Sequence, residues 1–255
     1  MLRILKTAAA GLADRFGYTI LPNWQIRTFE LVYHLRNLFN VYDVACVIDV
    51  GANTGQFAQF IRSQVGFAGP LISIEPVPEC FERLKRDALT DPDWIVVNAA
   101  LGAIEEERTF NVMANTAFSS FLEPYDGRLT QFARGNTVER TISLRTRRLD
   151  ELLTELENTR QLGRIYLKLD TQGYDLEVMK GVGERVAQIA ALQSEISVLP
   201  LYEGLIPWHE GIKAFKEYGF ELSGLWPVNR TPQLEVIEFD CVMVRPTQYQ
   251  AELPP

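Results

Sequence analysis

The sequence predicts an α/β fold: a mostly parallel, seven-stranded sheet with helices on both faces and an antiparallel last strand. Short apolar runs of strand length alternate with helix-length segments from residue 44 onward, and repeated units of this kind form parallel sheets covered by helices. The last two predicted strands are separated only by residues 227–234. That connection is too short for a crossover, so these two strands should pair antiparallel.

Two helices are predicted before the first strand. They span residues 2–16 and 25–39, where apolar side chains recur at helical spacing, and Pro22 separates them. We treat residues 1–43 as an N-terminal helical extension and residues 44–255 as the principal domain. The extension is expected either to cover the mouth of the ligand site or to contact a second copy of the chain in a homo-oligomer.

The principal domain repeats strand and helix, except over residues 104–148. Segments 108–113 and 141–146 alternate polar and apolar residues as half-buried strands do, and they enclose a segment, 115–125, that is rich in Ser, Thr, Asn and aromatic residues. We interpret this region as a β-excursion whose loop faces the substrate. The remaining strands are predicted at 44–50, 71–75, 94–99, 165–169, 190–198, 220–226 and 235–244, and the helices at 54–65, 77–88, 149–158, 174–181 and 207–217.

Composition narrows the class of protein. A chain of 255 residues suits one sizeable α/β domain. Its formal charge of −8 argues against a nucleic-acid-binding protein, which normally shows a basic face. Three cysteines without a C-x-x-C pair indicate reduced, mostly buried thiols in a cytoplasmic protein, with neither a disulfide framework nor a zinc site. No apolar run is long enough for a transmembrane segment.

The most informative segment is the end of the first predicted strand. Its apolar run ends Asp49-Val50-Gly51, and Gly55 opens the next helix. Glycines in this loop permit a tight turn and let the backbone approach a ligand closely. The amides of the following helix N-terminus favour an anionic group. The pattern therefore predicts a ligand site above this strand.

Glu75 ends the next predicted strand, about twenty residues past the glycine loop. An acid at this place suits the two hydroxyls of a ribose. The dinucleotide pattern G-x-G-x-x-G is absent, and the spacing is G-x-x-x-G with Asp49 two residues ahead. This arrangement suits S-adenosylmethionine better than a pyrophosphate, because Asp49 can meet the cationic amino group of the methionine part, directly or through water.

These motifs resemble the FkbM family of S-adenosylmethionine-dependent methyltransferases, many of which methylate hydroxyls of sugars or polyketides. The likeness covers roughly residues 44–245. The resemblance implies the Rossmann-like fold of class I methyltransferases, which agrees with the element order above. It rests on four blocks, at residues 47–57, 74–78, 167–175 and 193–197.

The resemblance also implies roles for individual residues. Asn98, which ends the third strand, would lie near the adenine, and Glu75 would bind the ribose. This chain has Gln172 where the family often carries Glu. That difference argues against a Mg²⁺-dependent reaction, and we assign no metal ligand. The residues that would hold the methionine part are Asp49, Gly51, Asn53 and Gly55.

Methylation of an alcohol requires a base, and three residues are candidates. Asp170 comes first, because it ends a strand that opens onto the same crevice as the glycine loop; its structural alternative is a helix-capping acid. Glu195, inside an apolar strand, comes second, and a purely structural ion pair with Lys168 would also explain it. His209 comes third, as an imidazole suited to neutral pH.

The predicted function is O-methylation of a hydroxyl on a sugar, a glycan or a related natural product. Two other functions stay open at this point. A nicotinamide-dependent oxidoreductase would share the strand, loop and acid, but no Tyr-x-x-x-Lys pair occurs and the glycine spacing is wrong. A non-catalytic protein that only binds a cofactor or a partner is the third possibility.

Overall fold

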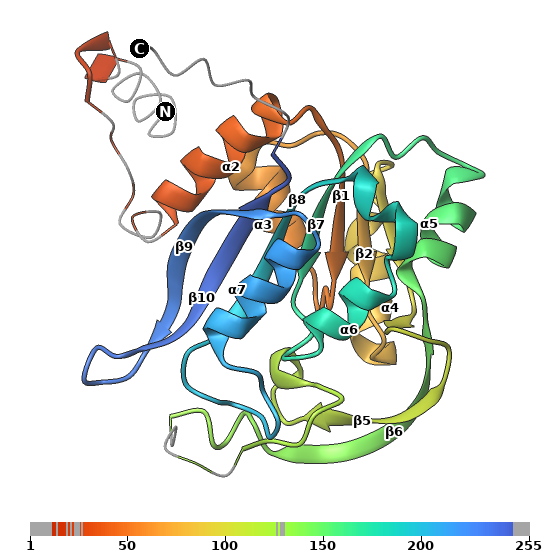
Figure 1. The fold of residues 1–255 in the computed structure, drawn as a ribbon. Helices are drawn as coiled ribbons and strands as arrows, with labels where there is room; N and C mark the ends of the chain where they lie inside the picture. Colours follow the sequence, from red (N-terminus) through yellow and green to blue (C-terminus); the bar gives the residue numbers. More distant parts are fainter. Residues whose placement is uncertain are drawn as a thin grey trace.

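The computed structural model describes residues 28–125 and 131–246, together with residue 127 and, before residue 28, residues 12–13, 15–18, 20, 22 and 26. The predicted helix over 2–16 lies almost wholly outside the described residues. Within the described part, helices enclose a large sheet, and a second, smaller sheet lies at one end of the molecule (Figure 1).

The large sheet has seven strands in the order β3-β2-β1-β7-β8-β10-β9. The strands from β3 to β8 pair in parallel, whereas β10 is antiparallel to both of its neighbours. The predicted sheet and its antiparallel last strand are therefore confirmed. The strands are β1 (Val44–Val50), β2 (Leu71–Ile74), β3 (Trp94–Val97), β7 (Arg164–Leu169), β8 (Ile189–Ser197), β9 (Glu221–Arg230) and β10 (Val236–Val244).

Both faces of the sheet are covered, which explains why the central strands are apolar without interruption. Ile48 of β1 faces a core shared with α5 (Leu149–Glu157), α6 (Asp175–Lys180) and α7 (Trp208–Glu217). Val47, its neighbour in the strand, faces the opposite core. That core is formed with α2 (Phe29–Val41), α3 (Gln56–Phe60) and the π-helical turn η2 (Ile61–Val65), while α4 (Pro78–Ala88) packs beside β3.

The predicted β-excursion forms a separate sheet in the order β4-β6-β5. Its strands are β4 (Ala100–Leu101), β5 (Glu107–Met113) and β6 (Val138–Arg147), and β5 pairs antiparallel with β6. The short 3-10 helix η3 (Thr116–Phe118) lies in the loop after β5. Figure 1 shows β5 and β6 beneath the ends to which the arrows of the central strands point.

Helix α2 lies at the other end of the molecule from the second sheet (Figure 1). Leu35 and Leu38 are buried against the sheet face, and Arg36 donates hydrogen bonds to the carbonyls of Gln64 and Val65. The helix is therefore part of the packed domain. The expectation that it covers the mouth of the ligand site is wrong for residues 29–41.

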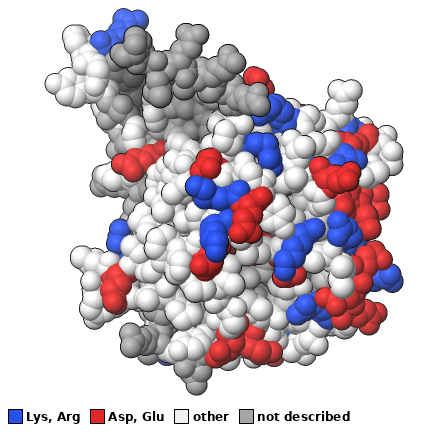
Figure 2. All heavy atoms as spheres, viewed as in Figure 1, with Lys and Arg blue, Asp and Glu red and all other residues white. Residues whose placement is uncertain are grey.

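The surface and the thiols agree with the composition. Acidic and basic side chains are interspersed on the face that Figure 2 shows, and no broad basic patch stands out among its coloured residues. Cys46, Cys80 and Cys241 are buried and carry free thiols. Across the described residues, we find no helix with the length and apolar character needed to cross a bilayer.

Candidate active site

The carboxyl ends of β1, β2, β7 and β8 converge on a cavity of about 290 Å³. Strand β1 lies between β2 and β7, where the order of the strands along the sheet reverses. In open α/β sheets ligands bind at this switch point, outside the carboxyl ends of the strands. The loop after β5 closes the cavity from the opposite side, with Thr116 and Phe118 in its lining.

Gly51 is required where β1 turns into the loop. Its φ is +80°, and a Cβ at this position would stand 2.1 Å from the backbone oxygen of Asp170. The amides of Gly51 and Ala52 both donate to the carbonyl of Ile74, at 3.0 and 3.1 Å. The glycine therefore lets the loops after β1, β2 and β7 approach one another at the edge of the cavity.

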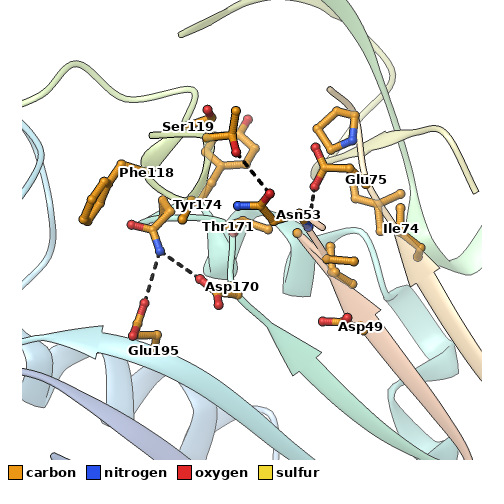
Figure 3. Close-up of a pocket in the computed structure, with 18 of the residues that line it drawn as sticks. Asp49, Asn53, Ile74, Glu75, Phe118, Ser119, Asp170, Thr171, Tyr174 and Glu195 are labelled. Carbon is orange, nitrogen blue, oxygen red and sulfur yellow. Dashed lines mark hydrogen bonds between the residues drawn. The ribbon is translucent and has the colours of Figure 1, made fainter. Parts of the chain in front are cut away.

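Glu75 is held by backbone amides at the end of β2. Its Oε2 accepts a hydrogen bond from the amide of Asn53 at 2.7 Å, and its Oε1 accepts one from the amide of Val77 at 2.8 Å. Burial raises the pKa of this carboxyl to about 7, against the effect of those two amides. Each oxygen keeps a further lone pair for a ligand hydroxyl. Figure 3 shows Glu75 and Asn53 on the same side of the cavity.

Asp49 lies deeper, at the end of β1 (Figure 3). Its side chain is buried and lines the cavity, and the hydroxyl of Ser73 stands 3.5 Å from Oδ2. Burial raises the pKa of Asp49 to about 7, although the Lys168 ammonium acts in the opposite direction. A buried carboxylate with so little hydrogen bonding is suited to receive a cationic group.

Two residues of the predicted cofactor set do not line the cavity. Gly55, with φ of +89°, begins α3, and a Cβ there would press on Leu84 and Trp94. Its role in the structure is close packing of α3. Asn98 uses its side-chain amide to bond the carbonyls of Glu75 and Pro76, at 2.8 and 3.2 Å. It thus holds the loop after β2 from an exposed position outside the cavity lining.

The acid predicted as the base, Asp170, faces the cavity from the end of β7. Its Oδ1 accepts a hydrogen bond from Gln172 Nε2 at 2.8 Å, and its Oδ2 lies 3.2 Å from Lys168 Nζ. Asp170 is not the acid that bonds the next loop amide, because Asp175 accepts from the Thr171 amide at 2.9 Å. The capping alternative, in which Asp170 bonds the amides of Gln172 and Gly173, is not what the structure shows: its carboxylate contacts the side chains of Gln172 and Lys168, and the N-cap of α6 is Tyr174.

Glu195 of β8 meets Asp170 through Gln172. The same Nε2 donates to Glu195 Oε2 at 3.1 Å, so one amide bridges two carboxylates (Figure 3). Burial, reinforced by the negative charges of Asp170 and Glu238, raises the pKa of Glu195 well above its usual range. The structural alternative for Glu195, an ion pair with Lys168, does not form; Lys168 pairs instead with Asp170, two residues further along the chain.

Gln172 is itself fixed in one orientation. Its Oε1 accepts a hydrogen bond from the hydroxyl of Tyr202 at 2.7 Å, and its backbone carbonyl accepts one from Ser120 Oγ at 2.8 Å. The amide NH₂ faces Asp170 and Glu195 because their carboxylate oxygens accept from it, and the Tyr202 hydroxyl lies between the amide oxygen and the Phe118 carbonyl, 2.8 Å away, with one proton for the two. The residue occupies the left-handed region, with φ of 53°.

Sequence reasoning missed two polar residues that line the same cavity, Asn229 of β9 and Glu238 of β10. Asn229 Nδ2 donates to Glu238 Oε2 at 3.1 Å. Burial raises the pKa of Glu238 to about 7. The sequence feature that could have indicated Glu238 is the presence of an acid within the apolar run of residues 236–244. What the sequence lacked was the register, which sets Glu238 opposite Ser197 in β8.

Aromatic and hydroxyl side chains complete the wall on the side of the second sheet. Phe121 packs edge-on against Phe110, and the centroids of the two rings are 4.9 Å apart. Its ring is also tilted against that of Tyr174, with the centroids 4.8 Å apart. All three line the cavity, together with Ser119 of the predicted substrate-facing loop. This side combines stacking surfaces with hydrogen-bonding groups, whereas the opposite side carries Asp49 and Glu75.

His209 stands apart from this arrangement. It lies in the first turn of α7 with 62% of its side chain exposed, and it is not part of the cavity lining. The structure thus brings together two of the three predicted catalytic residues, Asp170 and Glu195. Over the described residues, no group of three His, Cys, Asp or Glu side chains is arranged to hold a metal ion.

Comparison with known proteins identifies a family that matches this chain and a related methyltransferase. Residues 49–222 match the family described as Methyltransferase FkbM domain. Methyltransferase sdnD of Sordaria araneosa is 27% identical over 199 residues, which cover 68% of this chain and 74% of the relative.

Solved structures show distant likeness only. Fibrillarin of Aeropyrum pernix, crystallised with natively bound S-adenosyl-L-methionine, is 10% identical with a TM-score of 0.44, over 79% of this chain and 66% of fibrillarin. Precorrin-6y C5,15-methyltransferase of Geobacter metallireducens is 10% identical with a TM-score of 0.43, over 88% and 92% of the two chains. At this level the likeness bears on neither substrates nor residue roles.

Proposed function

The chain belongs to the FkbM methyltransferase family, and from that premise we propose that it methylates a hydroxyl group of a sugar, a glycan or a related natural product. Its methyl donor is S-adenosylmethionine. The observation that carries the proposal is the position of Asp170. This carboxylate faces the same cavity as Asp49, Gly51 and Glu75 and is oriented by Gln172 and Lys168.

The residues around the switch point fit S-adenosylmethionine. Gly51 lets the backbone of the loop after β1 lie directly against that of Asp170 at the edge of the cavity, because a Cβ would collide with the carbonyl of Asp170. Asp49 offers a buried carboxylate to the amino group, and the remaining lone pairs of Glu75 suit two ribose hydroxyls. Gly51 and Asn53 would lie against the methionine part, with their amides engaged by Ile74 and Glu75, and Gly55 and Asn98 would support these loops.

S-adenosylmethionine supplies a methyl group that its sulfonium has already activated. The protein then has two tasks: to align the acceptor oxygen and to remove its proton. Alignment can contribute effective molarities on the order of 10⁵–10⁸ M, and a positioned base adds about 10²- to 10⁴-fold. We assign the base to Asp170, whose Oδ1 and Oδ2 are oriented by Gln172 and Lys168, respectively.

Glu195 and Glu238 would position the acceptor. Both are held in place by side-chain amides, Glu195 by Gln172 and Glu238 by Asn229. Because their pKa values are raised, they are suited to share hydrogen bonds with neighbouring hydroxyls as donors as well as acceptors. The rings of Phe121 and Tyr174 offer apolar faces beside them, which is the combination that a sugar ring requires.

Calorimetric titration with S-adenosylhomocysteine, with NAD⁺ in parallel, is the first test. We expect micromolar binding of S-adenosylhomocysteine and none of NAD⁺. Transfer of a labelled methyl group from S-adenosylmethionine to a panel of glycosides and hydroxylated natural products then tests the acceptor. Label in an ether of a hydroxyl supports the proposal; label on nitrogen or carbon in the same panel contradicts it.

A further inference from the structure

A second cavity, of about 450 Å³, lies between α6 and α7 and has no role in the site described above. Its lining is mostly apolar and includes Leu122, Leu205, Ile206, Trp208 and Phe215. Ile206 and Trp208 are large apolar side chains of this lining, and they are 45% and 37% exposed to solvent. These two residues mark where the cavity opens to solvent.

This second cavity adjoins the reaction cavity. Tyr174 and Glu195 belong to the lining of both, so these two side chains form the partition between them. Gln172 lies on the reaction side and Gly173 on the other. A group bound in the second cavity would therefore lie next to the acid pair that faces the acceptor.

The partition is held loosely on one side. The hydroxyl of Tyr174 accepts its hydrogen bond from Arg108 Nη1 at 3.0 Å, and the side chain of Arg108 is 39% exposed. The guanidinium also stands over the rings of Tyr174 and Phe121, at 5.2 and 5.7 Å from their centroids. Tyr174 itself is buried, so Arg108 is the solvent-accessible member of this contact, and a ligand in the second cavity would meet both side chains.

We propose that the cavity between α6 and α7 binds an apolar portion of the methyl acceptor, an alkyl or aryl group attached to the part that carries the reacting hydroxyl. The proposal rests on the proposed function and adds that the acceptor is an amphiphile. Its polar part lies by Asp170 and Glu195, and its apolar part extends past Tyr174 toward Trp208.

The polar groups of the two cavities support this division. Asp170, Glu195 and Glu238 face the reaction cavity, where they suit hydroxyls. In the second cavity the basic residues Arg108 and Lys180 are paired with Glu106 and Glu177. The other polar side chains of its lining are engaged as well: Asp175 accepts from Thr171 and Ser194, Ser197 donates to Glu238, and Glu195, at the partition, accepts from Gln172. The remaining surface is therefore suited to contacts with hydrocarbon, because burial of apolar area is what it can offer a ligand.

Gly211 provides a selective test. It is a buried residue of α7 in the lining of the second cavity, and a Cβ there would meet only Ile206 Cδ1, at 3.6 Å. G211A therefore adds one methyl group at ordinary contact distance and improves helix propensity. G211L carries the same helix benefit but extends a side chain into the cavity. The two variants form a matched pair.

The experiment measures binding of butyl, hexyl and octyl glucoside, each below its micelle concentration, by calorimetry and by the change in tryptophan fluorescence that is lost when Trp208 is replaced by Phe. In the wild type and in G211A we expect each added methylene to tighten binding about fourfold, as burial of a CH₂ group does. In G211L we expect octyl glucoside to bind at least tenfold more weakly than in G211A, with unchanged affinity for S-adenosylhomocysteine.

Affinity in the wild type that does not depend on chain length would overturn the inference, whether or not G211L folds. The inference would also be overturned if affinity depended on the length of the alkyl chain equally in G211A and G211L. Titration with S-adenosylhomocysteine separates the two proposals. Binding of the nucleoside without any effect of chain length rejects only the apolar subsite. An effect of chain length without nucleoside binding rejects the proposed function and leaves the cavity as a ligand site.

Discussion

Gln172 Nε2 lies 2.8 Å from Asp170 Oδ1, and this hydrogen bond fixes the orientation of the carboxylate that we assign as the base. The same amide nitrogen reaches Glu195, while Tyr202 donates to the amide oxygen. Gln172 thus has every polar atom of its side chain engaged. It acts on the reaction through Asp170 and Glu195, as a positioning residue.

Replacement Q172E is expected to lower kcat by one to two orders of magnitude while leaving the affinity for S-adenosylhomocysteine within twofold. The new carboxylate cannot donate to Asp170 and Glu195 unless it takes up a proton. We therefore also expect the pH–rate profile to gain an ionisation that the wild type lacks. Y202F, which removes the hydroxyl between the amide oxygen and the Phe118 carbonyl but keeps the amide NH₂, serves as the milder comparison. An unchanged profile in Q172E would show that the amide bridge has no part in positioning the base.

Replacement D170N tests the base directly. The amide keeps the shape of the side chain but cannot accept a proton from the acceptor hydroxyl, so kcat should fall by about 10²- to 10⁴-fold. Calorimetry should show nearly unchanged binding of S-adenosylhomocysteine. E195Q should lose less, because Glu195 is assigned to acceptor positioning. A larger loss in E195Q than in D170N would exchange the two roles.

The sequence alone predicts the large sheet well, for a physical reason. Strand β1 is buried on both faces from Cys46 to Val50, which keeps that stretch apolar without interruption except for Asp49, and the predicted bounds match the observed Val44–Val50. The acids at strand ends were found because parallel strands end at one edge of the sheet. Asp49, Glu75 and Asp170 accordingly meet at one cavity.

Contacts between side chains from distant elements could not be predicted in the same way. The ion pair of Lys168 with Glu195, the structural alternative for Glu195, does not form: Lys168 pairs with Asp170, and Glu195 accepts a hydrogen bond from Gln172. Asn98 was placed by its strand-end position, yet its amide turns toward backbone carbonyls. Which side chains contact one another depends on the directions of those side chains and on the register between strands. The spacing of apolar residues in the sequence encodes neither.

Replacement G51A should destabilise the protein and weaken S-adenosylhomocysteine binding at least tenfold. The new Cβ would stand 2.1 Å from the Asp170 carbonyl, in addition to the cost of a φ of +80°. The matched control is G66A. Gly66 has a similar φ, +84°, but nothing lies within 4 Å of a Cβ there. The free energy of unfolding of G66A should fall only by the backbone cost, about 1–2 kcal/mol. Equal losses in both variants would show that the close approach at Gly51 has no effect of its own.

Replacement H209A should leave kcat within twofold of the wild type. His209 is mostly exposed in the first turn of α7 and lies outside the cavity lining. Its nearest acidic group, Glu210, stands 4.0 Å away and is also exposed. A loss of more than tenfold, with normal S-adenosylhomocysteine binding, would return the imidazole to the list of candidate bases.

Replacement D49N separates stability from cofactor binding. In the ligand-free protein the pKa of Asp49 is raised from 3.8 to about 7, chiefly by burial. The folded protein therefore binds this proton more tightly than the unfolded chain does. Between those two pH values the free energy of unfolding falls as pH rises, by up to about 1.4 kcal/mol per pH unit for this one group. The amide of D49N cannot titrate, so the variant should lose that part of the slope and be more stable at pH 8, by about 4 kcal/mol at most.

The same variant should bind S-adenosylhomocysteine more weakly, by about 10- to 100-fold at pH 8, because a charge-assisted hydrogen bond to the amino group is lost. In the wild type, affinity should fall toward tenfold per pH unit below pH 7 as Asp49 takes up its proton. In D49N that dependence should be shallower, with Glu75 still contributing. Denaturant unfolding and calorimetry from pH 5.5 to 8 measure both effects. A D49N protein that binds the nucleoside as tightly as the wild type at pH 8 would remove Asp49 from the cofactor site.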